Sequence, residues 1–108
     1  MSNVLIVVIV NKGYNDLVME AARESGARGG TVLGARGTGN QEIEKYYGVA
    51  IKPDKEIVLI VVAEEIKDKT LEAIGKAAGL ATKGQGIAFA LPVSDTVGLN
   101  GENEDPIK

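Results

Sequence analysis

Apolar residues gather in two strong runs along this chain, at residues 4–10 and 57–63. Both runs consist of Val, Ile, Leu and Ala without polar alternation, which is typical of central strands covered on both faces. Weaker apolar segments at residues 29–36 and 87–91 favour two shorter strands, and the glycines of the first indicate close approach of its backbone to a neighbour. The pattern therefore predicts four strands.

Two segments with a helical repeat lie between the strands. In residues 14–25 and again in residues 67–79, apolar positions recur three and four residues apart, so each segment presents one apolar face. Asn15 or Asp16 is placed to cap the first helix, and Gly26 is placed to end it. The pattern therefore predicts two helices.

The predicted order is strand, helix, strand, strand, helix, strand, an α+β arrangement that matches the ferredoxin-like βαββαβ sandwich. Residues 37–53 form a long connection between the second and third strands. One domain is expected over residues 1–100. The chain from Pro92 onward is polar and is expected to be loosely held, with residues 101–108 as a flexible tail. Many unrelated activities use this fold, so the order of elements indicates no function.

The chain contains neither histidine nor cysteine among its 108 residues. This excludes disulfides, thiolate chemistry and the commonest general base, and it leaves an enzyme only carboxylates, lysines and hydroxyls. With 12 basic against 15 acidic residues the net charge is −3, and aromatic residues make up 4%, so nucleic acid is not an expected partner. The first apolar run is too short to span a bilayer. We expect a soluble, cytoplasmic protein without direct membrane insertion.

Glycine clusters at residues 26–30, 34–39 and 84–86 are the strongest candidates for chemistry. Glycine lets peptide N–H groups face a bound anion, so such clusters can cradle phosphate. None has the spacing of a dinucleotide-binding or Walker motif. Ordinary turns explain each cluster when it is taken singly, so the three indicate a small-anion site only in combination.

In order and spacing, these clusters resemble the PII signalling protein family over nearly the whole chain, about residues 3–100. Residues 26–32 are similar to the segment that leads into the family's second strand, and residues 36–39 are similar to the base of its long T-loop. Lys55 and the strand after it resemble the chain that follows that loop. Residues 83–86 are similar to the B-loop, which precedes the fourth strand.

The resemblance implies a non-enzymatic signal-transduction regulator, built as a homotrimer, that binds an adenine nucleotide in each cleft between neighbouring subunits. The effector would be AMP, ADP, ATP or a cyclic dinucleotide, and no obligatory cofactor is implied. Binding would change the shape of the T-loop, which then holds or releases a target protein, for example a membrane transporter. By resemblance, the base and sugar would contact Ile9, Gly29, Gly30, Thr31 and Val61, and the phosphates would be met by Arg36, Gly37, Thr38, Gly39, Asn40, Lys55, Lys83, Gly84, Gln85 and Gly86.

Several positions depart from the family's pattern. Asn40 and Ile87 stand where the family has basic residues, and two expected arginines near the C-terminus fall at Gly98 and Asn100. Each missing charge-assisted contact is worth about 1.5–3 kcal/mol, so a triphosphate is expected to bind less tightly here than in other members. Residues 37–53 are also shorter than the T-loop of the nitrogen-sensing members.

Two other functions on the same fold stay open at this point. A metal-tolerance trimer of the CutA type would need metal ligands, and the absence of His and Cys argues against soft metals. A small acyl-phosphatase-like enzyme would need an arginine in a phosphate-binding loop with an asparagine partner. Arg36 and Asn40 are the candidates for that pair.

Overall fold

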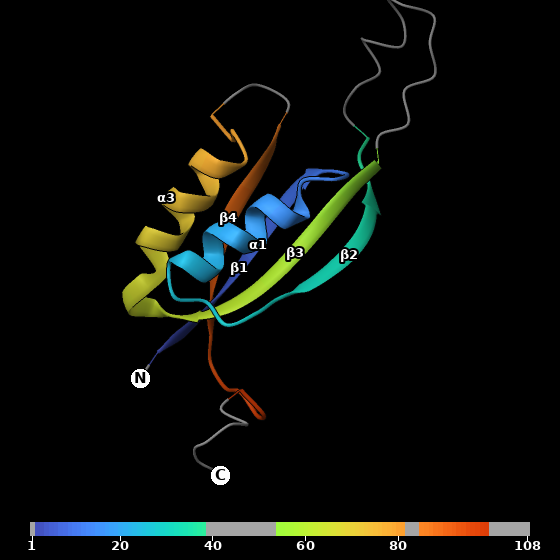
Figure 1. Ribbon diagram of the computed structural model, residues 1–108. Coiled ribbons are helices and arrows are strands. Elements are labelled where there is room, and N and C mark those ends of the chain that lie inside the picture. The colour runs from blue at the N-terminus through green and yellow to red at the C-terminus, as the bar shows by residue number, and fades with distance from the viewer. Residues whose placement is uncertain (1, 39–53, 82–84, 100–108) are drawn as a thin grey trace, which may run out of the picture.

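The computed structural model describes residues 2–38, 54–81 and 85–99, so most of the predicted connection (39–53) and the predicted tail (101–108) lie outside it. The described residues form a four-stranded antiparallel sheet with two α-helices on one face, which confirms the ferredoxin-like fold (Figure 1). No helix among them is long and apolar enough to cross a bilayer. The elements in chain order are β1 (Asn3–Asn11), α1 (Asn15–Glu24), β2 (Thr31–Arg36), β3 (Asp54–Ala63), the 3₁₀ turn η1 (Glu64–Ile66), α3 (Lys67–Ala77) and β4 (Gly86–Val93).

The strands lie in the order β2-β3-β1-β4, so β1 and β3 are central and β2 and β4 form the edges. Every neighbouring pair is antiparallel, and Val7 of β1 stands opposite both Leu59 of β3 and Phe89 of β4. Side chains directly opposite each other point to the same face of a sheet, and successive side chains alternate. The register thus assigns each strand residue to one of two faces.

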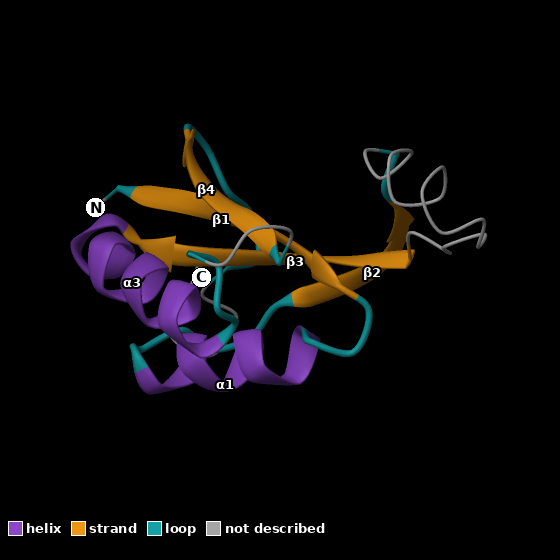
Figure 2. Cartoon of the chain, turned by 90° about the horizontal axis from the view of Figure 1, so that it is seen from above, coloured by secondary structure: helices purple, strands orange, loops and turns teal. Residues whose placement is uncertain are grey.

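The core lies between the helices and the face of the sheet that they cover (Figure 2). Ile6 and Val8 of β1 have no exposed surface, and the same is true of Val58 and Ile60 of β3. They belong to one apolar cluster with the inner faces of α1 and α3. Along both central strands, buried residues alternate with half-buried ones. The apolar runs predicted that both faces of the central strands are covered. Within one chain, the helices cover one of these two faces.

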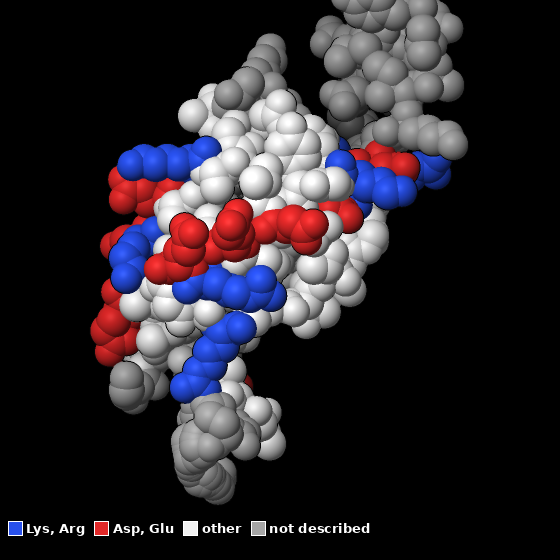
Figure 3. All heavy atoms as spheres, viewed as in Figure 1, with Lys and Arg blue, Asp and Glu red and all other residues white. Residues whose placement is uncertain are grey.

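The second face of the sheet, which we call the open face, is apolar as well. Four of its side chains are more than a third exposed: Leu33 at 44%, Phe89 at 39%, Leu91 at 47% and Ile87 at 56%. Figure 3 shows charged side chains of both signs over the helices, on the other side of the molecule. A contiguous apolar surface marks an interaction site in soluble proteins. The open face comprises Leu5, Val7 and Ile9 of β1, Leu33 of β2, Ile57, Leu59 and Val61 of β3, and Ile87, Phe89 and Leu91 of β4.

Three strand boundaries differ from the predicted ones by two residues or more. β2 begins at Thr31, two residues later than predicted, and β3 begins at Asp54, three residues earlier. β4 continues to Val93, so Pro92, predicted to begin a loose tail, belongs to the sheet. Proline is tolerated there because β4 is an edge strand, where one side of the backbone needs no donor.

The start of α1 is capped by a residue of β3. Tyr14 precedes the helix and makes no side-chain cap, and Asn15 and Asp16 are already helical, so the prediction that one of these two caps the helix is wrong. Instead, Glu56 Oε1 accepts hydrogen bonds from the backbone N–H of Gly13 (3.0 Å), from the backbone N–H of Asn15 (3.2 Å) and from Asn15 Nδ2 (2.8 Å). This carboxylate also faces the positive end of the helix dipole.

Glu56→Gln is expected to weaken this cap and to change how stability depends on pH. The side-chain hydrogen bond from Asn15, with the backbone bonds from Gly13 and Asn15, lowers the pKa of the Glu56 carboxyl below its ordinary value of 4.5. Because the pKa of Glu56 is lower in the folded than in the unfolded chain, the carboxylate stabilises the fold fully at pH values above the unfolded pKa. This stabilisation is lost as the pH falls through the folded pKa. The variant should lose about 1 kcal/mol at neutral pH.

Urea unfolding of both proteins, at equal concentration and at several values from neutral pH down through the acid limb, measures this difference. The two stability curves should converge below the folded pKa of Glu56, since the carboxyl is then protonated in the wild type. A constant offset between the curves at every pH would show that the charge of Glu56 has no role.

Candidate functional site

A cavity of about 950 Å³ lies at the end of the sheet where β1 begins and β3 ends. Gly29, Gly30, Thr31 and Val61, which the sequence predicted to line one pocket, all border it. We call these four residues the glycine half-site. The described residues that line it are Asn3, Gly26, Ala27, Arg28, Gly29, Gly30, Thr31, Leu59, Val61, Val62, Ala63, Ile66, Thr96 and Leu99.

Gly30 lets the chain before β2 lie directly on β3. A Cβ atom at Gly30 would stand 2.9 Å from the backbone oxygen of Leu59, 3.0 Å from Met19 Sδ and 3.1 Å from Ile60 Cγ1. These distances are shorter than van der Waals contact, so any side chain would push the connection away from the sheet. The close approach predicted from the glycines is confirmed at this residue, while a Cβ at Gly29 would meet open space.

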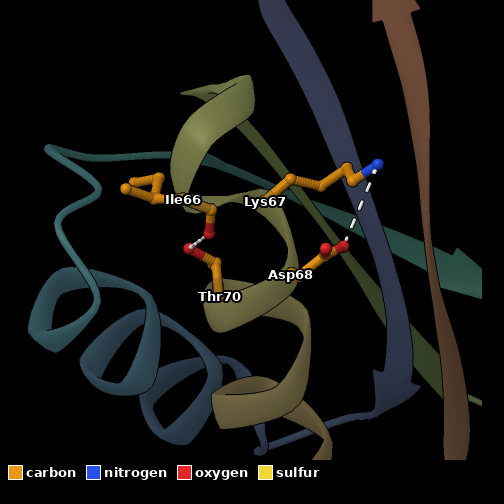
Figure 4. A network of polar contacts seen from close by, with 4 residues as sticks. All are labelled: Ile66, Lys67, Asp68 and Thr70. Carbon is orange, nitrogen blue, oxygen red and sulfur yellow. Dashed lines mark hydrogen bonds and ion pairs between the residues drawn. The ribbon is translucent and has the colours of Figure 1, made fainter.

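Ile66, at the end of η1, forms another part of the cavity wall. Its backbone oxygen accepts a hydrogen bond of 2.7 Å from Oγ1 of Thr70, a residue without exposed surface (Figure 4). The bond satisfies the buried hydroxyl and ties η1 to the first turn of α3. The neighbouring ion pair between Lys67 Nζ and Asp68 Oδ1 is long, at 3.9 Å, and solvent-exposed, so it adds little stability.

The cavity combines apolar walls with a few neutral polar groups and one cation. Its apolar part includes Leu59, Val61 and Leu99, and its polar side chains come from Asn3, Thr31, Thr96 and Arg28. None of the described residues that line it is acidic. A mixture of apolar walls and a few polar groups is typical of small-molecule sites.

A second group of predicted residues lies at the opposite end of the sheet. Lys55 stands opposite Asn11, the last residue of β1, and its Nζ donates a 2.6 Å hydrogen bond to Asn11 Oδ1. Arg36, at the end of β2, stands opposite Asp54. We call this group the lysine half-site; its described residues are Ile9, Arg36, Gly37, Thr38, Lys55, Gln85 and Gly86.

Gly86 shapes this second half-site through its backbone. Its φ of +143° is one that residues with a side chain rarely adopt, and a Cβ there would lie 2.1 Å from the backbone oxygen of Ile9. The start of β4 therefore lies against the end of β1. Beside it, Oε1 of Gln85 is buried and has no hydrogen-bond partner among the described residues. A buried acceptor without a hydrogen-bond donor destabilises the fold, so such groups normally have a partner.

The two half-sites lie at different levels along β3, with Thr31 opposite Leu59 and Ile9 opposite Ile57. Val61 of the first and Lys55 of the second are six residues apart on the extended strand β3, which corresponds to about 20 Å. Ile9, which the resemblance grouped with the glycines, stands opposite Ile57 of β3 and lies against Gly86 of β4.

Several residues of the cavity were not predicted. Arg28 stands inside the first glycine cluster, so its charge was a visible signal in the sequence. Thr96 and Leu99 belong to the segment predicted to be loose, and nothing local indicated that they return to the start of β1. Of the predicted site residues, Gly39, Asn40, Lys83 and Gly84 lie outside the described residues.

The residues proposed for the two alternative functions can be placed as well. In the part of the chain that the structure describes, no group of three or more acidic residues could hold a metal ion. Arg36 is exposed at the end of β2, and Asn40, its proposed partner for phosphatase chemistry, lies outside that part. No described geometry favours either alternative.

Comparison with known proteins agrees with the fold. No curated protein sequence matches the chain. Among solved structures, the chain is similar to the crystal structure of Arabidopsis thaliana PII bound to citrate, with a TM-score of 0.72 and 26% sequence identity over 91% of this chain and 83% of that one. The family model described as nitrogen regulatory protein P-II matches residues 3–103. The chain is therefore a member of the nitrogen regulatory protein P-II family.

Proposed function

We propose that this protein is a non-enzymatic regulator that binds an adenine nucleotide, or a related small anion, in clefts between neighbouring copies of the chain and thereby controls a partner protein. The observation that carries the proposal is the division of the predicted binding residues into two half-sites, whose most distant members, Val61 and Lys55, are about 20 Å apart along β3. We infer that a ligand in the cleft receives one half-site from each of two chains. The Arabidopsis PII structure was determined with a small polyanion, citrate, which supports a small-anion ligand.

The open face supports the assembly that such a shared cleft requires. Burial of apolar surface contributes about 25 cal/mol per Å², and the open face offers side chains such as Leu91 and Ile87 that remain about half exposed in a single chain. A ring of identical chains joins different parts of neighbouring copies, whereas a two-fold dimer joins identical parts. We therefore propose a homotrimeric ring, in which the glycine half-site of one chain meets the lysine half-site of the next.

The position of the T-loop supports a regulatory output. Residues 37–53 connect the end of β2 to the start of β3, and the flanking residues Arg36 and Asp54 stand opposite each other at the lysine half-site. A ligand bound there would contact both ends of the connection, so its presence would bias the conformations open to that segment. We propose that this segment contacts the target protein, with a membrane transporter as the first candidate.

Isothermal titration against AMP, ADP, ATP and a cyclic dinucleotide tests the proposal. We expect at least one of them to bind, and Lys55→Gln to weaken that binding about tenfold through loss of a charged contact. Lys76→Gln is the control, because Lys76 is an exposed residue of α3 whose ion pair with Glu72, at 3.9 Å, is also exposed. Absence of binding by all four ligands would refute the nucleotide proposal, and equal affinity in the Lys55 variant would refute the role of Lys55.

A further inference from the structure

The ammonium group of Lys55 has a neutral partner inside the lysine half-site. Its Nζ donates a 2.6 Å hydrogen bond to Oδ1 of Asn11, and both residues are half-buried at the end of the sheet. We propose that Asn11 is a positioning residue, which holds the Lys55 ammonium in place without cancelling its charge, so that the ligand's anionic group can bind it. This inference rests on the proposed function and names a residue through which its site acts.

The geometry of β3 separates Lys55 from the acidic residues on either side of it in the sequence. Asp54 and Glu56 are its neighbours along the strand, and successive side chains of a strand point to opposite faces. Glu56 binds the start of α1 on the helix-covered face, whereas Lys55 stands opposite Asn11 and bonds to it. Among the described residues, Lys55 forms no ion pair. Neither acidic neighbour is therefore paired with its ammonium group.

A neutral partner leaves Lys55 able to bind an anion. An ammonium group has three N–H donors, and the bond to Asn11 uses one of them, so the others remain for a ligand. An amide oxygen carries only a partial charge, whereas a carboxylate in the same place would form an ion pair with Lys55 and repel a bound anion. Asn11 thus restricts the flexible side chain of Lys55 and preserves its attraction for an anion.

The backbone around Asn11 is held from two sides. Its backbone oxygen accepts a 3.2 Å hydrogen bond from the backbone N–H of Tyr14, which precedes α1. The backbone N–H of Lys12 donates a 3.2 Å hydrogen bond to the backbone oxygen of Asp54, at the start of β3. The residue that orients Lys55 is therefore itself fixed, as an effective positioning residue requires.

Asn11→Asp tests this role, because it keeps the size of the side chain and its acceptor oxygen and adds a negative charge. The probe is ATP, the most highly charged of the mononucleotides titrated above. We expect calorimetry to show at least about tenfold weaker binding in Asn11→Asp. Asn11→Ala releases Lys55 without neutralising it and should weaken binding less, by about threefold. Lys76→Gln is the matched control, since it changes the net charge by the same amount at an exposed site on α3.

Urea unfolding separates positioning from a purely structural role. Asn11→Asp should be at least as stable as the wild type at neutral pH, because an ion pair with Lys55 replaces the neutral hydrogen bond. Its affinity for ATP should therefore fall without a fall in stability. An unchanged affinity in Asn11→Asp, or losses of affinity that follow losses of stability in both variants, would overturn the inference.

Inorganic pyrophosphate distinguishes failure of this inference from failure of the proposed function, which the nucleotide titrations decide separately. If ATP does not bind the wild type, pyrophosphate is titrated while the ammonium resonance of Lys55, assigned by its loss in Lys55→Gln, is followed by NMR. A saturable shift in the wild type that is absent from Asn11→Asp would support the positioning role on its own. No shift in the wild type, or the same shift in Asn11→Asp, would overturn it.

Discussion

We expect Leu91→Asp to abolish self-association of the chain, and Leu17→Asp to leave it intact. Leu91 lies on the open face and Leu17 on the outer side of α1, and in the single chain they are exposed to similar extents, 47% and 43%. If copies associate through the open face, the aspartate at Leu91 is buried without a partner. Burial of an unpaired charge costs several kcal/mol for each copy, which exceeds what one contact in an assembly provides.

Sedimentation equilibrium at micromolar concentration measures the outcome. The wild type and Leu17→Asp should sediment as trimers, and Leu91→Asp as a monomer with an unchanged helical circular dichroism spectrum. The matched exposure of the two leucines excludes a general effect of added charge. A trimeric Leu91→Asp protein would show that the open face is not the surface between copies.

The second large effect is expected for Gly86→Ala, which should lower the free energy of unfolding by about 3–5 kcal/mol. A methyl group there would collide with the backbone oxygen of Ile9, 2.1 Å away, and the φ of +143° is itself unfavourable for alanine. Backbone strain of this kind costs about 1–3 kcal/mol and overpacking a similar amount. Since Gly86 and Ile9 both belong to the lysine half-site, ligand affinity should fall together with stability.

Gly34→Ala is the control for this effect. Gly34 lies within β2, and a Cβ there would meet nothing within 4 Å, so the substitution should change stability by less than about 1 kcal/mol. Urea unfolding at equal protein concentration compares the two variants. A Gly86→Ala protein as stable as Gly34→Ala would contradict the close packing of β4 on the end of β1.

The sequence predicted the order of elements because strong local signals agree with the fold. The runs at residues 4–10 and 57–63 became β1 and β3, and Gly26, predicted to end the first helix, has a φ of +116° just after α1. The same runs predicted cover on both faces of the central strands. The helices cover only one face, so the uninterrupted apolar pattern is best explained by a second cover from outside the chain.

Other features could not be read from the sequence because they join distant segments. Glu56 caps a helix that begins 41 residues earlier, and no local pattern indicates such a partner. Thr96 returns to a cavity formed by the start of β1 and the end of β3. The resemblance placed Ile9 with Gly30, whereas the register of the strands sets Ile9 on β1 and the chain at Gly30 beside β2, with β3 between them. Only this register shows which strand carries each predicted residue.

A mixing experiment tests most directly whether neighbouring chains share the site. Thr31→Glu places a carboxylate in the glycine half-site, and Lys55→Glu places one in the lysine half-site, so each pure variant should lose ligand binding by charge repulsion. Unfolding the two variants together and refolding them as mixed rings should restore binding in about a quarter of the clefts, those formed by two intact half-sites. If the mixture binds no more ligand than the separate variants do, the site does not lie between chains.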